Sequence, residues 1–287
     1  MVKSKAGRLL AVDIGNTNVT LGVFDKDRLA GMWRMASDPN RTSDEYGGSI
    51  LSFLNASCRE KTKNPRGRIF SGVSVATVVP ALGPVFQEVA RKYFGVEPFV
   101  FHAGLPVGIK IRVDHPAEVG ADRILNALAA YHLYRGPAIV IDFGTATTFD
   151  CVSGRGDYLG GAILPGPGLL VEGLAGRTAR LPKVEIAEPG RAIGKNTVQC
   201  IQAGVFYGYI GMVDKLLRMT LKEMLPGPKP RIFLTGGLSV LFGKKLSFNH
   251  RVVPDLTLQG LRLAYEFSNT LRSPLAELGD ERSRKAA

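Results

Sequence analysis

Two stretches of this chain share one plan, AVDIGNTNVT at residues 11–20 and IVIDFGTATTFD at 139–150. In each, an apolar strand ends in Asp-X-Gly, and small polar residues lead into a second strand. A single turn of this kind is explained equally well by turn chemistry, because Gly permits a positive φ and Asp or Asn stabilises the bend. Two such turns favour a phosphate site, in which backbone N–H groups meet phosphate oxygens and the carboxylate holds a hard cation. We therefore expect two similar α/β units that together grip a nucleotide.

The apolar periodicity predicts two successive cycles of strands and helices. The first cycle has strands near 9–12, 19–23 and 29–35, a helix over 43–56, a strand and loop over 68–80, a helix over 81–95 and a short strand from 98. The second has a helix over 120–135, a strand, turn, strand and turn over 137–161, a long helix over 194–219, a strand and glycine turn over 230–239, and a last helix over 259–272. We predict lobes of residues 1–115 and 116–287, with the last helix packing back on the first lobe.

An overlay of the two hairpins without a gap places Asp13 over Asp142 and Gly15 over Gly144. Beyond the turn it places Thr20 over Phe149. The identical positions are few. What indicates a repeat is that both Asp-X-Gly turns follow an apolar strand and lead into a second strand.

Other sites are disfavoured by the motifs that the chain lacks. It has no GxxxxGK[ST] loop, and no GxGxxG follows a strand. The three cysteines are widely spaced without a CxxC, which excludes a disulfide framework and a zinc site. No apolar run approaches the roughly 18 residues of a membrane span, so we expect a cytoplasmic protein that does not enter the membrane. The net charge of +12 favours acidic ligands such as nucleotides. The basic residues are dispersed, so nucleic acid is not an expected partner.

Three motifs at these turns resemble those of a known superfamily. VDIGNT (12–17), VIDFGTATT (140–148) and LTGGLS (234–239) resemble the phosphate-1, phosphate-2 and adenosine motifs of the acetate and sugar kinase, Hsp70 and actin superfamily. HPAEVGADRILNA (115–127), GGAILPGPGL (160–169) and GKNTVQCIQAGVFYG (194–208) resemble type III pantothenate kinases, over residues 8 to about 270. The resemblance implies an actin-like ATPase fold, with two ribonuclease-H-like lobes of mixed sheets flanked by helices. It also implies ATP-dependent phosphorylation of pantothenate to 4'-phosphopantothenate, the first step of coenzyme A biosynthesis.

The resemblance assigns the nucleotide and cation contacts to the two hairpins. Asp13 is implied to organise Mg²⁺ indirectly together with the phosphates. Asp142 is implied to bind a monovalent cation, K⁺ or NH₄⁺. The implied ATP-binding residues are Asp13, Ile14, Gly15, Asn16, Thr17, Asn18, Val19, Thr20 and Thr145.

The acceptor side is expected at the start of the helix over 120–135. From the residues alone, Asp122 is equally well explained as a cap of this helix or as a functional carboxylate. The resemblance implies that Asp122 is the base for the pantothenate hydroxyl. Arg123 then pairs either with the pantothenate carboxylate or with the phosphoryl group, and the sequence leaves both open. The implied substrate-binding residues are Gly120, Ala121, Asp122, Arg123, Thr197 and Val113.

The resemblance also implies a homodimer, in which Thr197 reaches the substrate across the interface. The helix after Thr197 carries Gly204, Gly208 and Gly211 on one face. Glycines inside a helix cost about 1 kcal/mol each, so the pattern indicates close approach of another element. That element is either the chain's own sheet or a partner, and the sequence does not decide between them.

One position departs from the family pattern. Val113 stands where related kinases commonly have a tyrosine, and His115 stands where they often have an asparagine. Val113 has no hydroxyl to donate to a substrate. Two alternatives therefore stay open: a kinase of the same fold with another small hydroxyl acceptor, and an accessory transcription regulator.

Overall fold

The computed structural model describes residues 7–57 and 70–284, the last 14 of them as backbone only. The expected strand start at Arg68 and Ile69 lies outside these residues. The chain divides into two compact units that interleave in sequence. Unit 1 comprises Met1–Ile109, His115–Ala129 and Thr257–Ala287, and unit 2 comprises Lys110–Asp114 and Ala130–Leu256. The contiguous lobes 1–115 and 116–287 stay a prediction.

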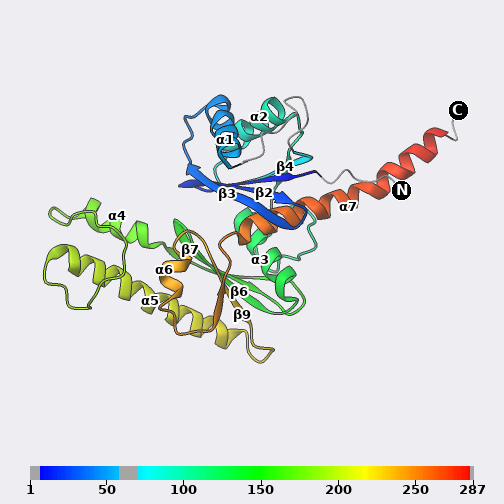
Figure 1. Ribbon diagram of the computed structural model, residues 1–287. Coiled ribbons are helices and arrows are strands. Elements are labelled where there is room, and N and C mark those ends of the chain that lie inside the picture. Colours follow the sequence, from blue (N-terminus) through cyan, green and yellow to red (C-terminus); the bar gives the residue numbers. More distant parts are fainter. Residues whose placement is uncertain (1–6, 58–69, 285–287) are drawn as a thin grey trace. The chain divides into compact units, whose positions relative to one another are not determined.

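Unit 1 is built on a mixed five-stranded sheet in the order β3-β2-β1-β4-β5. Its strands are β1 (Leu9–Ile14), β2 (Asn18–Asp25), β3 (Arg28–Ala36), β4 (Gly72–Thr77) and β5 (Phe99–Phe101). β1, β2 and β3 are antiparallel neighbours, whereas β4 runs parallel to β1 and β5 runs parallel to β4. Helices α1 (Ser43–Ser57) and α2 (Leu82–Phe94) pack against one face of the sheet (Figure 1).

Local signals explain where the helices of unit 1 begin and end. Thr42 and Glu45 form a reciprocal cap at the start of α1: the Thr42 N–H donates to Glu45 Oε2 over 2.8 Å, and the Glu45 N–H donates to Thr42 Oγ1 over 3.3 Å. α2 ends at Gly95, which has a φ of 62°. The first turns of α7 (Leu256–Arg284) also belong to this unit, and Ser74 Oγ on β4 donates to the Leu261 carbonyl over 3.3 Å. The sequence predicted this helix only over 259–272.

Unit 2 repeats the sheet of unit 1 strand for strand, in the order β8-β7-β6-β9-β10. Its strands are β6 (Ala138–Phe143), β7 (Ala146–Val152), β8 (Tyr158–Pro165), β9 (Arg231–Thr235) and β10 (His250–Val252). β6, β7 and β8 are antiparallel neighbours, while β9 is parallel to β6 and β10 to β9. The predicted α/β class with two mixed sheets flanked by helices is confirmed.

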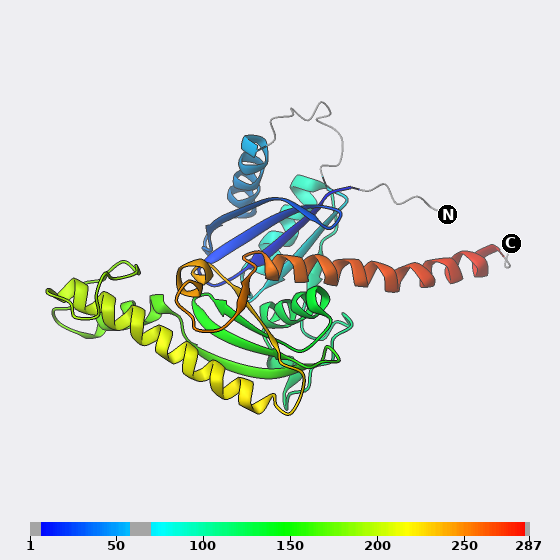
Figure 2. The same cartoon turned by 60° about the horizontal axis from the view of Figure 1, so that its bottom comes forward.

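Two helices of unit 2, α5 (Thr197–Glu223) and α6 (Ser239–Gly243), pack against one face of its sheet. α5 runs alongside the strands (Figure 2, yellow) and α6 follows β9. Their core joins alternate residues of β6 and β7 to aromatic side chains of the two helices. These aromatic residues are Phe206, Tyr209 and Phe242, all fully buried. α4 (Pro167–Arg177) packs against α5.

A third helix, α3 (Ala121–Tyr134), begins in unit 1 and continues into unit 2 after Ala129. A single 3₁₀ turn over Pro116–Glu118 precedes it. Within the described part of the chain, no helix is both long and apolar enough to cross a bilayer.

Candidate functional site

The first Asp-X-Gly turn joins β1 to β2 in unit 1. Asp13 pairs with Thr20 across the hairpin, so these two side chains share one face of the sheet. The Gly15 N–H donates to the Asn18 carbonyl over 3.0 Å and closes the turn. Asn16, Thr17 and Asn18 at its tip are exposed, whereas Ile14 and Val19 are fully buried. Of the eight predicted contacts in this segment, Ile14 and Val19 therefore have only backbone groups to offer a ligand.

The second turn joins β6 to β7 in unit 2 and has the same build, with one residue fewer. Asp142 pairs with Thr148, as Asp13 pairs with Thr20. The ungapped overlay of Thr20 on Phe149 is therefore wrong by one residue, because the second turn is shorter. Gly144 and Thr145 at its tip are exposed. In each hairpin a threonine thus pairs with the aspartate, and the Thr148 hydroxyl donates to Asp150 Oδ2 over 3.1 Å.

A glycine turn after β9 lies directly against Asp142. β9 runs parallel to β6, and Thr235 pairs with Asp142. Gly236 follows with a φ of 87°, and a Cβ placed on it would overlap the Asp142 carboxylate. Ser239 Oγ donates to the Gly236 carbonyl over 2.8 Å and holds the turn at the start of α6. The predicted phosphate-2 and adenosine motifs are therefore in contact within unit 2.

Gly166 is a neighbour of the second turn that sequence reasoning did not assign to the site. Its N–H donates to the Thr145 carbonyl over 3.0 Å, and a Cβ on it would overlap the carbonyls of Gly144 and Thr145. Gly166 is also the residue before α4, so this helix begins at the turn. A helix N-terminus carries partial positive charge that suits phosphate. The sequence signal for it is the Gly-Pro-Gly run within GGAILPGPGL (160–169), a motif to which no role was assigned.

Asp142 is the charged oxygen group of the second turn. Its carboxylate lies against Gly236, whereas the carbonyls of Gly144 and Thr145 lie against Gly166, and carboxylate and carbonyl oxygens are ligands of hard cations. Among the described residues there is no cluster of three His, Cys, Asp or Glu side chains that would hold a metal ion. A single carboxylate at this turn can balance one positive charge.

The predicted acceptor residues lie at the start of α3 in unit 1. The Arg123 N–H donates to Asp122 Oδ1 over 2.9 Å, and it also contacts the Gly120 carbonyl at 3.2 Å. A Cβ on Gly120 would come within 2.5 Å of Asp122 Oδ1, so a glycine allows the carboxylate to fold back over the helix start. Ala121 is buried and anchors this first turn. The Asp122 carboxylate thus accepts a backbone N–H within the first turn of α3.

The environment of Asp122 makes its carboxyl a better proton acceptor than an exposed aspartate. Burial raises its pKa above the ordinary 3.8, against the opposing effects of the Arg123 N–H and the Arg123 charge. A base with a raised pKa accepts a proton more readily near neutral pH. Both Asp122 and Arg123 are half-buried.

Val113 and Thr197, the other predicted substrate contacts, belong to unit 2. Val113 follows a short bridge to β8, in which the Arg112 N–H donates to the Tyr158 carbonyl over 2.8 Å. Its Cγ1 would lie 3.4 Å from a Cβ on Gly160, so it packs beside the glycines of β8. Thr197 is the first residue of α5 and is exposed in this chain. Asn196 fixes the helix start, because its side chain accepts the Gln199 N–H over 2.9 Å.

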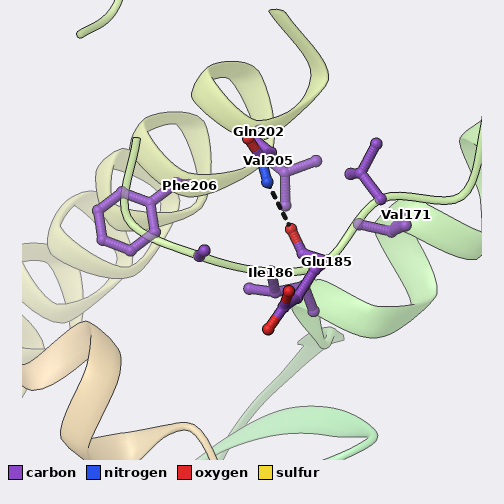
Figure 3. A pocket seen from close by; sticks show the side chains of 8 residues that line it. Val171, Glu185, Ile186, Gln202, Val205 and Phe206 are labelled. Atoms are coloured by element: carbon purple, nitrogen blue, oxygen red, sulfur yellow. Dashed lines mark hydrogen bonds between the residues drawn. The ribbon is translucent and has the colours of Figure 1, made fainter. Parts of the chain in front are cut away.

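Unit 2 also has a small hollow, which is too tight to hold a water molecule (Figure 3). It lies between α4, α5 and the segment that joins them, and its lining includes Val171, Ile186, Val205 and Phe206. Gln202 Nε2 donates to the Glu185 carbonyl over 3.1 Å across it. Val171, Val184, Ile201 and Val205 form a small apolar cluster there. The hollow is thus an imperfectly filled part of the packing beneath a long loop.

The predicted site residues therefore fall into two groups. Unit 1 holds the Asp13–Thr20 hairpin and the Asp122 helix start, and unit 2 holds Asp142, Thr145, Val113 and Thr197. Within unit 2, the Gly236 turn contacts Asp142, and Gly166 contacts the Thr145 carbonyl. This arrangement can present glycine backbone groups and hydroxyls to phosphates from each hairpin.

Comparison with known proteins extends these observations. A sequence profile described as type III pantothenate kinase matches residues 9–219. A type III pantothenate kinase of Moorella thermoacetica is 47% identical over 258 residues, covering 90% of this chain and 98% of that protein. One from Dehalococcoides mccartyi strain CBDB1 is 44% identical over 261 residues, covering 91% of this chain and 96% of that protein.

Solved structures resemble this chain at low sequence identity. A putative Baf family transcriptional activator from Campylobacter jejuni has a TM-score of 0.51 and 17% identity, covering 91% of this chain and 99% of its own. The activator of 2-hydroxyisocaproyl-CoA dehydratase from Clostridium difficile, with bound ADPNP, has a TM-score of 0.51 and 11% identity, covering 94% and 97%. These likenesses concern the fold alone, and with the two repeated sheets they confirm the predicted actin-like fold. From the profile match and the identity to its relatives, the chain belongs to the type III pantothenate kinase family.

Proposed function

We propose that this protein transfers the γ-phosphoryl group of ATP to the primary hydroxyl of pantothenate, forming 4'-phosphopantothenate for coenzyme A synthesis. The observation that carries the proposal is family membership over about 90% of the chain, at 47% identity to a type III pantothenate kinase. The two repeated Asp-X-Gly hairpins and the carboxylate at the start of α3 supply groups that such a transfer needs. Because ATP is the proposed donor, the cytoplasm is the proposed location.

Each hairpin is proposed to contact the phosphates of the nucleotide. Asn16, Thr17 and Asn18 offer backbone N–H groups and polar side chains at an exposed tip, and the Gly15 N–H closes the turn beneath them. Thr145 offers the same at the second tip. Asp13 repels phosphate by its own charge, so its proposed role is to orient Mg²⁺ through water, with Thr20 beside it. When bound with ATP, Mg²⁺ neutralises charge on the phosphates.

Asp142 is the proposed ligand of a monovalent cation, K⁺ or NH₄⁺. Its carboxylate lies against Gly236 and beside the turn that carries Thr145, so a cation there would order the turn. Such a cation supplies one positive charge near the nucleotide phosphates.

Asp122 is the proposed acceptor of the pantothenate proton. Phosphoryl transfer has a loose transition state, in which the attacking hydroxyl stays protonated until late. The carboxylate therefore acts chiefly by orienting the hydroxyl, and its raised pKa helps it to take the proton. Gly120 and Ala121 shape this helix start. Arg123 can pair with the pantothenate carboxylate or with the phosphoryl group, and both roles use its charge.

A homodimer is the proposed assembly, with Thr197 supplied to the substrate across the interface. α5 leaves several apolar side chains exposed in the single chain, including Val198 at 44%, Met212 at 41% and Met219 at 49%. A Cβ on Gly204, Gly208 or Gly211 would meet no atom within 4 Å. These glycines therefore do not pack against the chain's own sheet. Of the two alternatives, this favours a partner subunit as the element that approaches the glycine face of α5.

Val113 supports a second candidate, a kinase of the same fold with another small hydroxyl acceptor. Its side chain is half-buried beside Gly160 and has no hydroxyl for a substrate contact. If pantothenate is the acceptor, another group replaces the hydrogen bond of the family's tyrosine.

Turnover of pantothenate with ATP, Mg²⁺ and K⁺ tests the proposal directly. We expect formation of 4'-phosphopantothenate and ADP, and slower turnover when Na⁺ replaces K⁺. Absence of product, with ATP still bound, would favour another acceptor. Equal rates in K⁺ and Na⁺ would remove the cation role of Asp142.

Asp122→Asn tests the base with little change of shape. We expect kcat to fall by roughly 10²–10⁴-fold, the usual contribution of a positioned acid or base, with nucleotide binding retained. Glu88→Gln is the matched control, because Glu88 is exposed on α2 in the same unit and loses the same charge. Wild-type turnover by Asp122→Asn would exclude Asp122 as the base.

A further inference from the structure

A pair of hydroxyl groups is buried between the second hairpin and α5. Thr147 on β7 and Tyr209 on α5 are both fully buried, and their side-chain oxygens form a hydrogen bond. The Tyr209 ring packs against Phe143 and Phe242, with ring centroids 6.2 Å and 4.8 Å away. The hydrogen bond therefore lies inside an apolar core, where an unpaired hydroxyl is costly. Neither hydroxyl has a role in the site described above.

The pair lies close to the proposed cation and nucleotide groups. Thr147 follows Thr145 by two residues and pairs in register with Phe143, the neighbour of Asp142. The charge of Asp142 reaches the phenol: burial, with a further effect of Asp142, raises the pKa of Tyr209 to about 12 despite the bond to Thr147. Tyr209 thus keeps its proton at neutral pH, and its hydroxyl stays a neutral partner beside a negatively charged group.

The second turn is also held from the side of α4. Its tip residues Gly144 and Thr145 are exposed, and the Gly166 N–H holds the Thr145 carbonyl from the direction of α4. Thr147 is the first fully buried residue after the tip. A hydrogen bond at this position limits how far the β7 end of the turn can shift.

The same helix carries Thr197, the proposed acceptor contact. Tyr209 follows it by twelve residues, about 18 Å along an α-helix at 1.5 Å per residue. The position of α5 against β7 therefore sets the distance between the Gly144–Thr145 turn and the start of α5. The bond between Tyr209 and Thr147 is a directional contact at that place, unlike the apolar contacts around it.

We propose that Tyr209 is a positioning residue, whose hydroxyl holds Thr147 and thereby keeps Asp142 and the Gly144–Thr145 turn in the geometry required by the monovalent cation and the nucleotide. The inference rests on the proposed kinase function. In this role Tyr209 does not contact a substrate, and its effect is transmitted through Thr147 to the Gly144–Thr145 turn.

Tyr209→Phe removes the hydroxyl and keeps the ring in the core. We expect the K⁺ concentration for half-maximal activity and the KM for ATP to rise by roughly twofold to tenfold, the range for loss of one hydrogen bond. The KM for pantothenate should rise less than the KM for ATP, because Asp122 and Arg123 are untouched and Thr197 lies about 18 Å along α5 from Tyr209. Tyr207→Phe is the matched control: Tyr207 is exposed on the same helix, and its hydroxyl donates to the Pro189 carbonyl over 3.0 Å.

Thr147 provides a second route to the same test. Thr147→Ser keeps a hydroxyl and should preserve the K⁺ dependence, whereas Thr147→Val should reproduce the Tyr209→Phe effect. The double variant Tyr209→Phe/Thr147→Val should be no worse than the more affected single variant, because both remove one bond. This series remains informative if one variant folds poorly.

Binding of ATP in the absence of pantothenate gives a readout independent of turnover. Calorimetric titrations in K⁺ and in Na⁺ should show that K⁺ strengthens ATP binding by wild type, and that Tyr209→Phe reduces this gain. An unchanged gain in Tyr209→Phe would overturn the proposal even if its thermal stability falls, since that is the result of a purely structural pair. No gain in wild type would also overturn it. Failure of the proposed function appears separately, as ATP binding without pantothenate phosphorylation.

Discussion

The contact between Gly236 and Asp142 is the most demanding feature of the proposed cation site, and Gly236→Ala tests it. Gly236 has a φ of 87°, in the region that L-residues rarely adopt. A Cβ there would overlap the Asp142 carboxylate, and it would lie 2.6 Å from the Phe143 carbonyl carbon and 2.7 Å from the Phe143 nitrogen. The two Phe143 atoms are backbone in a buried strand, so they cannot move aside as a side chain can.

The expected cost has two parts. A side chain in the left-handed region costs about 1–2 kcal/mol. Overpacking in a close-packed region costs about 1–3 kcal/mol. Gly236→Ala should therefore lower the free energy of unfolding by about 2–5 kcal/mol. Because the Cβ displaces the Asp142 carboxylate, K⁺ should also lose much of its effect on ATP binding.

Gly156→Ala is the matched control, because Gly156 has the same φ of 87° in another turn of unit 2. Its Cβ would meet the ring of Tyr131 at 2.7 Å, and this half-buried side chain can shift. Urea unfolding followed by far-UV circular dichroism measures both costs. Gly156→Ala should be the milder variant and should keep the K⁺ dependence. A Gly236→Ala protein within about 0.5 kcal/mol of wild type, below the cost of the φ alone, would refute the reasoning.

Two further predictions concern Asp122 and α5. Burial raises the pKa of Asp122, so the folded protein binds a proton at this carboxyl more tightly than the unfolded chain does. The stability that this proton contributes is fully present below the pKa of the unfolded chain, and it is lost as the pH rises through the pKa of the folded protein. At neutral pH Asp122→Asn should therefore be more stable than wild type, and the difference in urea unfolding should vanish as pH falls below about 4; a difference independent of pH would contradict this. Gly208→Ala should stabilise the isolated helix by about 1 kcal/mol. It should also weaken the proposed dimer in sedimentation equilibrium, because α5 faces would no longer approach closely, and an unchanged dimer constant would place the interface elsewhere.

Local sequence patterns were sufficient for the strands and turns that carry the site. An apolar run that ends in Asp-X-Gly can stop only at a turn, so the positions of Asp13 and Asp142 at strand ends followed from the residues themselves. The helix start at Asp122 followed in the same way, from Gly120 and the apolar periodicity after it. β8, α4 and β10 were not predicted as separate elements. β8 contains Gly160 and Gly161 and exposes Ile163, and β10 has only three residues, so neither has a strong periodic pattern.

Contacts between segments distant in sequence could be decided only by the tertiary structure. Thr148, and not Phe149, is the counterpart of Thr20, because each pairs with the aspartate of its own hairpin. This register depends on the length of the turn, which the Asp-X-Gly motif does not reveal. Gly236 lies close to Asp142 because β9 pairs with β6 in parallel. Tyr209 meets Thr147 because α5 packs on β7, which is 62 residues away in sequence. Sequence patterns thus determined where chemistry-bearing residues lie on their own elements. Which of them meet was decided by packing, since short-range preferences carry no information about long-range neighbours.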